Sequence, residues 1–327
     1  MNPVLQVKNL TTCLRIGKQD FPVVNQIYFD LHSGKTLALV GESGCGKSMT
    51  ALSLMRILPT PHAVPSTGEV IYREKNLLEI PESEMRNIRG NNIGMIFQDP
   101  MSSLNPVYSI GDQLLEVAEV HLGLEGDEAE GKVIQALEDV GIPNPVVRFH
   151  DYPHQLSGGM KQRVMIAMSL MCEPDILIAD EPTTALDVTI QAQVLQLMRE
   201  LQQKTGMAIL LITHDMGVVS EMADDVLVMY ATKEIEKGTK KQIFDNRSHP
   251  YTEGLFNSLP QVHQPKEKLN VIKGSVPSIQ ELPGGCHFHP RCPYVMDMCR
   301  QGGVPDFILE TDYTTKCWLY RDRDVSS

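Results

Sequence analysis

Short apolar runs alternate with amphipathic stretches over the first 240 residues of the chain. Four runs are predicted to be buried strands because nearly all of their residues are apolar, at 35–40, 93–97, 176–179 and 208–213. Helices are predicted at 47–58, 111–122 and 132–140, and Pro59 is expected to stop the first of them. Strands that alternate with helices are typical of an α/β domain with a largely parallel sheet.

The pattern changes near residue 250. A last amphipathic helix is predicted at 250–259, and the segment after it is rich in proline, glycine and lysine and then in cysteine. We therefore divide the chain into a large α/β domain over 1–250, with a helical part at about 100–172, and a small cysteine-rich extension over 251–327.

Composition narrows the class of protein. Hydrophobic residues make up 42% of the 327 residues, which is enough for a packed core and too many for a disordered chain. The formal net charge is −12 and no basic run is present, which disfavours a nucleic-acid partner. No run approaches the roughly 18 apolar residues of a membrane-spanning helix, and the first ten residues lack the features of a signal peptide. We expect a cytoplasmic protein that meets a membrane only through a partner.

One motif indicates phosphate binding. Residues 41–48, Gly-Glu-Ser-Gly-Cys-Gly-Lys-Ser, match G-x-x-x-x-G-K-[ST] between a predicted strand and a predicted helix, a context that excludes a plain glycine-rich turn. The N–H groups of such a loop surround a phosphate, the lysine attracts the β and γ oxygens, and the last hydroxyl binds Mg²⁺. We assign nucleotide contacts to Gly41, Ser43, Gly44, Cys45, Gly46, Lys47, Ser48 and Met49.

Two adjacent carboxylates follow the strand at 176–179. Asp180 is placed to hold Mg²⁺ through its water shell, and Glu181 to polarise an attacking water. Taken alone, such a pair is more often two solvated acids at a strand end. Its presence in one domain with Lys47 favours a nucleotide hydrolase.

A second anion-binding turn, Ser157-Gly158-Gly159, opens a predicted helix that runs to about residue 171. One nucleotide fills only one phosphate loop, so this turn has no use inside a single protomer. In a head-to-tail pair, each protomer's turn would cover the γ-phosphate bound by the other. The simpler alternative is a helix capped by Ser157 and followed by two flexible glycines.

Together these motifs resemble the nucleotide-binding domain of ABC transporters, over nearly all of residues 3–260. The Walker A loop lies at 41–48, the signature Leu-Ser-Gly-Gly at 156–159 and the Walker B strand at 176–181. The resemblance implies a RecA-like core with a helical subdomain, and ATP hydrolysis with Mg²⁺ coupled to transport. It also implies that Gln98 senses Mg²⁺ and the attacking water, that Asp187 belongs to the D-loop, and that His214 contacts the γ-phosphate.

Longer segments resemble the D-type ATP-binding subunits of dipeptide and oligopeptide permeases, whose relatives import nickel. The matching segments are 97–106, 152–160, 249–252 and the cysteine-bearing tail. The resemblance implies import of di- or oligopeptides, with a nickel or other small-solute importer as the alternative. A soluble ABC ATPase acting on nucleic acid is disfavoured because the chain has a single domain and no heptads.

The same resemblance implies a set of partners. These are a second ABC ATPase subunit that would form a heterodimer, two transmembrane permease subunits and an extracytoplasmic substrate-binding protein, with no nucleic acid. The chain would lie peripherally on the cytoplasmic face of the inner membrane, and residues around 102–125 would dock a permease helix.

Two positions depart from the family pattern. Leu14 stands where relatives usually stack an aromatic ring on adenine, which leaves Phe21 or aliphatic contacts as alternatives. Thr232 stands where relatives usually have glycine in the turn after residues 229–231. Because a β-branched residue resists positive φ, we expect this turn to differ locally.

Four of the seven cysteines cluster in the extension: Cys286, Cys292, Cys299 and Cys317. In a cytosolic protein such a cluster favours a metal over disulfides. Four thiolates suit tetrahedral Zn²⁺ or a [4Fe–4S] cluster, and four unligated thiols are a further alternative. The resemblance to the D-type subunits favours the [4Fe–4S] cluster. Because the nucleotide site is expected to lie wholly before residue 250, we expect ATP hydrolysis to survive loss of this metal better than transport does.

Cys45 has a different environment. It lies beside Lys47 at a helix N-terminus, and both features lower the pKa of a thiol. We therefore expect thiol reagents to modify Cys45 and Mg-ATP to protect it.

Overall fold

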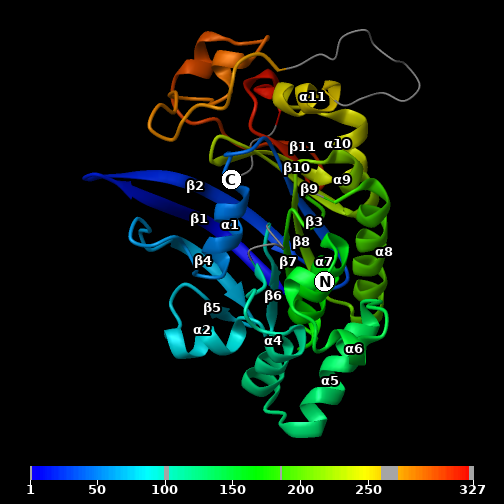
Figure 1. Cartoon of the computed structure of the whole chain (residues 1–327). Helices are drawn as coiled ribbons and strands as arrows, with labels where there is room; N and C mark the ends of the chain where they lie inside the picture. Colours follow the sequence, from blue (N-terminus) through cyan, green and yellow to red (C-terminus); the bar gives the residue numbers. More distant parts are fainter. Residues whose placement is uncertain (1, 99–102, 185, 259–271, 324–327) are drawn as a thin grey trace. The chain divides into compact units, whose positions relative to one another are not determined.

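The computed structural model describes residues 2–98, 103–184, 186–258 and 272–323 (Figure 1). Contacts between residues divide the chain into two compact units. Unit 1 comprises Met1–Val4, Leu31–Thr36 and Glu79–Ile212, and unit 2 comprises Leu5–Asp30, Leu37–Leu78 and Thr213–Ser327. The chain thus passes repeatedly from one unit to the other. Within the described part of the chain, no helix has both the length and the apolar character needed to span a bilayer.

Unit 1 contains three parallel strands and a group of helices. The strands are β6 (Ile93–Ile96), β7 (Ile176–Asp180) and β8 (Ala208–Thr213), with Ile176 of β7 opposite both Ile93 and Ala208. Every residue of β7 and β8 is buried, which accounts for their continuous apolar sequences. Helix α7 (Gly158–Leu170) contacts β6 and α8 (Val188–Thr205).

The helical part of unit 1 follows β6 in the chain. Its described elements include α4 (Ile110–Val117), a π-helical turn η1 (Ala118–Leu122), α5 (Gly126–Asp139) and α6 (Pro145–Arg148). Ser109 starts α4 with a capping box, in which its hydroxyl accepts from the N–H of Asp112 and its own N–H donates to that carboxylate. The unit also contains α2 (Glu82–Ile88) and the 3₁₀ turn η2 (Pro153–Gln155).

The strands of unit 2 include a four-stranded antiparallel sheet that the periodicity did not predict. Its order is β2 (Gln19–Leu31), β1 (Leu5–Ile16), β4 (Thr67–Tyr72) and β5 (Lys75–Asn76). A second set of strands begins with β3 (Thr36–Val40), which is parallel to β9 (Asp225–Tyr230). From β9 the pairing continues antiparallel through β10 (Lys233–Thr239) and β12 (Tyr313–Thr315) to β11 (Phe307–Glu310).

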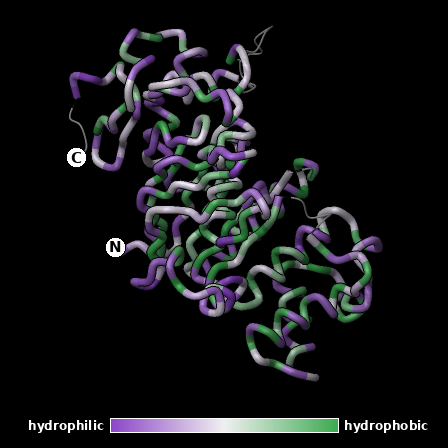
Figure 2. The backbone as a smooth tube through the Cα atoms, turned by 90° about the vertical axis from the view of Figure 1, so that its left-hand side faces the viewer, coloured by the Kyte–Doolittle hydropathy of each residue, from purple (hydrophilic) through white to green (hydrophobic). Residues whose placement is uncertain are grey.

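The described part of unit 2 also contains four α-helices: α1 (Lys47–Leu54), α9 (Met216–Met222), α10 (Lys240–Asn246) and α11 (Pro250–Asn257). Helix α1 ends before the predicted stop at Pro59, because Met55 caps it and Arg56 turns to a left-handed φ of 52°. Hydrophobic positions (green) and hydrophilic positions (purple) are interleaved along the tube in Figure 2, and every position of β8 is buried.

The segment after residue 272 shares the core of unit 2. Strand β12 pairs with β10, with Thr315 opposite Glu236, and Phe288 packs its ring against Tyr230 and Tyr251. Three 3₁₀ turns, η3 (His289–Arg291), η4 (Asp297–Arg300) and η5 (Trp318–Tyr320), make up much of the rest. The predicted boundary near residue 250 falls between α10 and α11, inside this unit.

Candidate functional site

The phosphate loop at 41–48 lies in unit 2 between β3 and α1, as predicted. Gly46 precedes the helix with φ of 110°, and a Cβ there would overlap the carbonyl of Val23, so the position requires glycine. The Lys47 side chain is buried and turns back over the loop, donating to the carbonyls of Gly41 (2.7 Å) and Glu42 (3.1 Å). The ammonium group is thereby held inside the loop.

The other predicted loop residues divide by exposure. Ser43 and Gly44 are exposed, while Ser48 and Met49 are half-buried in the first turn of α1. At the start of unit 2, Leu14 on β1 and Phe21 on β2 are both half-buried, which leaves the alternatives for adenine stacking open.

The environment of Cys45 contradicts the predicted reactivity. Its side chain is fully buried, and this burial raises the pKa of the thiol, outweighing the lowering effect of the Lys47 charge. The prediction of an accessible thiol of low pKa is therefore wrong. The backbone of Cys45 remains part of the loop.

The turn after β9 reaches the phosphate loop. The N–H of Thr232 donates to the carbonyl of Cys45 (2.9 Å), and its own carbonyl accepts from the N–H of Asn25 (2.8 Å). Thr232 has φ of 75° and Ala231 has φ of 42°. The expected local difference is thus wrong, because Thr232 takes the left-handed conformation that favours glycine. Its buried hydroxyl finds no hydrogen-bond partner among the described residues.

The carboxylates of unit 1 lie at the end of β7. Asp180 is the last residue of the strand and is buried, and the N–H of Glu181 donates to the carbonyl of Ile212 (2.8 Å). One oxygen of Glu181, Oε2, accepts from Gln98 Nε2 (3.1 Å) and from Thr184 Oγ1 (2.9 Å). The structure therefore brings together the predicted water-polarising acid and the predicted Q-loop glutamine. Thr184 adds a contact that we did not predict.

Two helices of unit 1 begin at predicted motif residues. Ser157 caps α7 by accepting from the N–H of Met160 (3.3 Å), and Asp187 caps α8 by accepting from the N–H of Ile190 (3.0 Å). A Cβ at Gly159 would lie 2.9 Å from Ile190 Cγ2, whereas Gly158 has open space around it. Capping by Ser157 is confirmed, and a role of this turn in a second protomer stays a prediction.

His214 follows β8 and is exposed. The next residue, Asp215, caps α9 by accepting from the N–H of Gly217 (2.7 Å). Of the two compact units, unit 2 contains His214, Lys47 and Ser48. Unit 1 contains Gln98, Glu181 and Ser157.

The four cysteines of the extension line one narrow cavity, and all four are free thiols. Burial raises the pKa of Cys286 to about 11 and that of Cys317 to about 12. Backbone N–H groups donate to three of the sulfurs: Phe288 and His289 to Cys286, Tyr294 to Cys292, and Leu319 to Cys317. Such donors suit thiolate ligands of a metal centre. Among the described residues, however, no group of three or more His, Cys, Asp or Glu side chains is placed to hold a metal ion.

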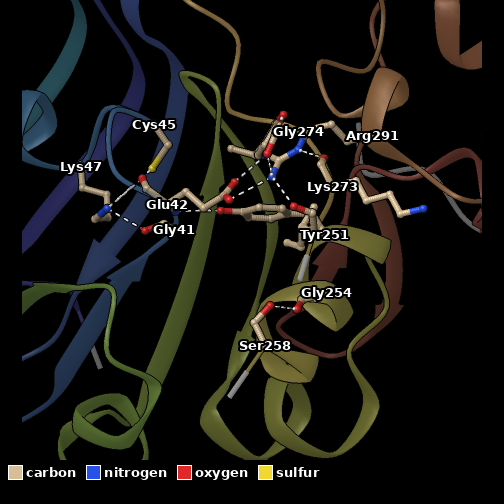
Figure 3. Close-up of polar contacts among 12 residues, drawn as sticks. Gly41, Glu42, Cys45, Lys47, Tyr251, Gly254, Ser258, Lys273, Gly274 and Arg291 are labelled. Carbon is tan, nitrogen blue, oxygen red and sulfur yellow. Dashed lines mark hydrogen bonds and ion pairs between the residues drawn. The ribbon is translucent and has the colours of Figure 1, made fainter. Parts of the chain in front are cut away.

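The sequence did not predict two further residues of the phosphate-loop region. Tyr251 and Arg291, both after residue 250, contact Glu42 within the loop (Figure 3). The segment 249–252 had been noticed for its resemblance to known permeases, but no local pattern indicated which loop it would contact.

Comparisons with known proteins identify the family of the chain. Residues 24–184 match the ABC transporter family, and residues 235–299 match the oligopeptide/dipeptide transporter C-terminal region. The chain is 48% identical over 323 residues to the dipeptide transport ATP-binding protein DppD of Bacillus subtilis, covering 99% of this chain and 96% of that protein. It is 46% identical over 300 residues to the oligopeptide transport ATP-binding protein OppD of Haemophilus influenzae, covering 92% of each.

Solved structures show the same fold. The ATP-binding cassette MJ0796, in a dimeric post-hydrolysis state with ADP and Pi, matches with a TM-score of 0.62 at 25% identity, over 72% of this chain and 98% of that one. The structure of cbiO1 from Clostridium perfringens matches with a TM-score of 0.63 at 28% identity, over 76% of this chain and 92% of that one. The predicted α/β cassette fold is thereby confirmed. The chain belongs to the family of ABC-transporter ATP-binding proteins, in the branch that carries the oligopeptide/dipeptide transporter C-terminal region.

Proposed function

We propose that this protein is the ATP-hydrolysing subunit of an importer that takes up di- and oligopeptides across the cytoplasmic membrane. The observation that carries the proposal is its similarity, over nearly the full length of both chains, to ATP-binding proteins of dipeptide and oligopeptide transport. The match includes the C-terminal region, which a general ATP-binding cassette does not need.

In this proposal the loop at 41–48 binds the phosphates of ATP. Lys47, held over the loop, attracts the β and γ oxygens, and the hydroxyl of Ser48 with the carboxylate of Asp180 would hold Mg²⁺, which neutralises charge on the phosphates. Glu181 accepts a proton from the attacking water, and the contacts from Gln98 and Thr184 orient its carboxylate for this task. His214 contacts the γ-phosphate.

The proposal extends to the assembly. The Ser157-Gly158-Gly159 turn and Asp187 act across a head-to-tail pair with a second, homologous ATPase subunit. Two transmembrane permease subunits and an extracytoplasmic substrate-binding protein complete the importer, and this chain binds peripherally at the cytoplasmic face. Val107, Tyr108 and Val120 are exposed apolar side chains in the segment expected to dock a permease helix, which supports this arrangement.

A deletion strain tests the transported substrate. A host that lacks this chain should fail to accumulate labelled di- and tripeptides, and the wild-type chain should restore uptake while Glu181→Gln should not. Labelled Ni²⁺ uptake should be the same in all three strains. Normal peptide uptake in the deletion strain, with loss of Ni²⁺ uptake, would instead establish the nickel importer.

We further propose that Cys286, Cys292, Cys299 and Cys317 hold a [4Fe–4S] cluster. Their common cavity and the N–H groups directed at three of the sulfurs support thiolate ligation. Zn²⁺ is the alternative, because four thiolates also suit a tetrahedral zinc site.

A further inference from the structure

Glu42 places a negative charge inside a loop that is expected to bind a polyanion. It is the second residue of the phosphate loop, and its carboxylate is 30% exposed. Arg291 from the extension pairs with it through both guanidinium nitrogens, with Nη1 2.6 Å from Oε2 and Nη2 3.0 Å from Oε1 (Figure 3). Such a two-point pair fixes the geometry of the carboxylate and neutralises its charge.

The guanidinium group of Arg291 is held in place by its own surroundings. Its side chain is only 6% exposed. Nε donates to the carbonyl of Lys273 (3.0 Å), Nη2 donates to that of Gly274 (3.3 Å), and Nη1 donates to the hydroxyl of Tyr230 (3.3 Å). The charge is therefore presented to the loop by a rigid support rather than by a mobile surface side chain.

A second contact holds the backbone of the same loop residue. The N–H of Glu42 donates to the hydroxyl of Tyr251 (2.7 Å), and the Tyr251 ring is fully buried against Tyr230 and Phe288. The backbone and the side chain of Glu42 are thus both fixed by residues that follow position 250.

We propose that Arg291 is a positioning residue of the nucleotide site, which cancels the charge of Glu42 so that ATP affinity depends on the cysteine-rich extension. The inference rests on the proposed role of residues 41–48 in ATP binding. It corrects the expectation that the nucleotide site lies wholly before residue 250. Because Arg291 directly precedes Cys292, a ligand that holds that thiol would also restrain the backbone of Arg291.

The affinity of the full-length protein for Mg-ATP tests the proposal, measured by equilibrium titration together with KM and kcat. Arg291→Gln leaves Glu42 unpaired beside the phosphates, so Kd and KM should rise about tenfold with a much smaller change in kcat. The matched control is Arg300→Gln, because Arg300 is exposed and adjoins Cys299 in the same way; it should bind Mg-ATP like the wild type. Equal affinities for Arg291→Gln and the wild type would overturn the proposal.

A second change separates charge from structure. If Glu42 is the source of the repulsion, adding Glu42→Gln to Arg291→Gln should restore most of the lost affinity, and high salt should shrink the deficit of the single variant. An equally weak double variant would show that Arg291 acts only through folding. If Arg291→Gln does not fold, Arg291→Lys replaces it in the test, because lysine keeps the positive charge but lacks the two-point geometry. The Kd of Arg291→Lys for Mg-ATP should rise above the wild-type value by less than the tenfold expected for Arg291→Gln.

Lys47→Ala distinguishes failure of the inference from failure of the proposed function. It should abolish Mg-ATP binding in the wild-type and the double-variant backgrounds alike. Undiminished binding by Lys47→Ala would refute the role of the loop itself, whereas lost binding together with a silent Arg291→Gln would refute only the role of Arg291.

Discussion

The amide of Gln98 donates to the carboxylate of Glu181, with 3.1 Å between Nε2 and Oε2. Gln98 precedes Glu181 by 83 positions in the chain. Thr184, which follows Glu181, donates to the same oxygen at 2.9 Å. Two donors on one oxygen fix the orientation of a carboxylate on a short segment after β7. That arrangement suits a group that must meet a water molecule in a defined position.

Replacing Glu181 by Gln should lower kcat for ATP hydrolysis by at least about 100-fold, because general-base assistance contributes factors of that order. The amide of the new side chain still offers an oxygen to Thr184 and Gln98, so the local structure should persist and Mg-ATP should still bind. Steady-state hydrolysis and equilibrium ATP binding, measured on the same preparation, check both statements.

The matched control for that variant is Glu200→Gln, an exposed acid on α8 in the same unit that accepts from Gln196. It should hydrolyse ATP at the wild-type rate. Wild-type turnover by Glu181→Gln would remove Glu181 from the proposed mechanism.

Cys45 should react slowly with N-ethylmaleimide in the folded protein at pH 7, because its thiol is buried and burial raises its pKa. Mg-ATP should make little difference to a thiol that is already inaccessible. Mass spectrometry of the labelled protein checks this, with the half-buried Cys13 as an internal comparison. Rapid inactivation that disappears in Cys45→Ser would contradict the buried position.

Local sequence predicted the strands and loops that carry the chemistry. The apolar runs at β3, β7 and β8 lie in fully buried strands. The phosphate loop follows the carboxyl end of β3, and the acid pair lies at the carboxyl end of β7. Such continuous apolar runs can be recognised in the sequence because strands covered on both faces need apolar residues at nearly every position.

The antiparallel sheet of unit 2 was missed for the opposite reason. In β1, buried positions such as Leu5, Val7 and Leu10 are mixed with exposed polar ones, and the run is interrupted where the register with β4 shifts between Lys8 and Thr11. The pair between Glu42 and Arg291 joins residues 249 positions apart, so no local pattern could contain it. At Thr232 the residue type predicted a changed turn, but its bonds to Cys45 and Asn25 hold the left-handed conformation.

His249 should make the protein less stable in acid. It is fully buried, and burial lowers its pKa to about 3, whereas the unfolded chain takes up a proton near pH 6.5. The stability that neutral His249 contributes is therefore complete above pH 6.5 and is lost as the pH falls towards 3. By pH 5 the loss should amount to about 2 kcal/mol.

Denaturant unfolding of His249→Asn between pH 7 and pH 5 measures this effect. Asparagine can still cap α11 by accepting from the N–H of Tyr251, as His249 Nδ1 does at 3.1 Å, but it does not titrate. The free energy of unfolding of this variant should therefore fall less steeply with pH than that of the wild type. His154→Asn, at an exposed histidine, should keep the wild-type slope, and equal slopes in all three proteins would contradict the argument.

The cysteine cluster should give the protein a colour. Anaerobically purified protein should be brown, absorb broadly near ~400 nm and contain about four irons per chain, as a Cys₄-ligated [4Fe–4S] cluster requires. Cys292→Ser should bleach the protein, whereas Cys172→Ser, at a half-buried cysteine of unit 1, should leave the colour unchanged.

Loss of the cluster should also weaken ATP binding. Cys292 is the neighbour of Arg291, and the extension shares Phe288 with the aromatic packing that buries Tyr251, so both contacts to Glu42 depend on this segment. Cys292→Ser should accordingly raise the Kd for Mg-ATP, as Arg291→Gln does, and expose residues beyond 272 to proteolysis.

Two other outcomes would change the assignment of the metal. Colourless protein with one zinc per chain would replace iron by zinc and keep the four-cysteine site. Metal-free protein with four titratable thiols and unchanged ATP affinity would show that the extension needs no metal, because packing within unit 2 would then be enough to hold Arg291 against the loop.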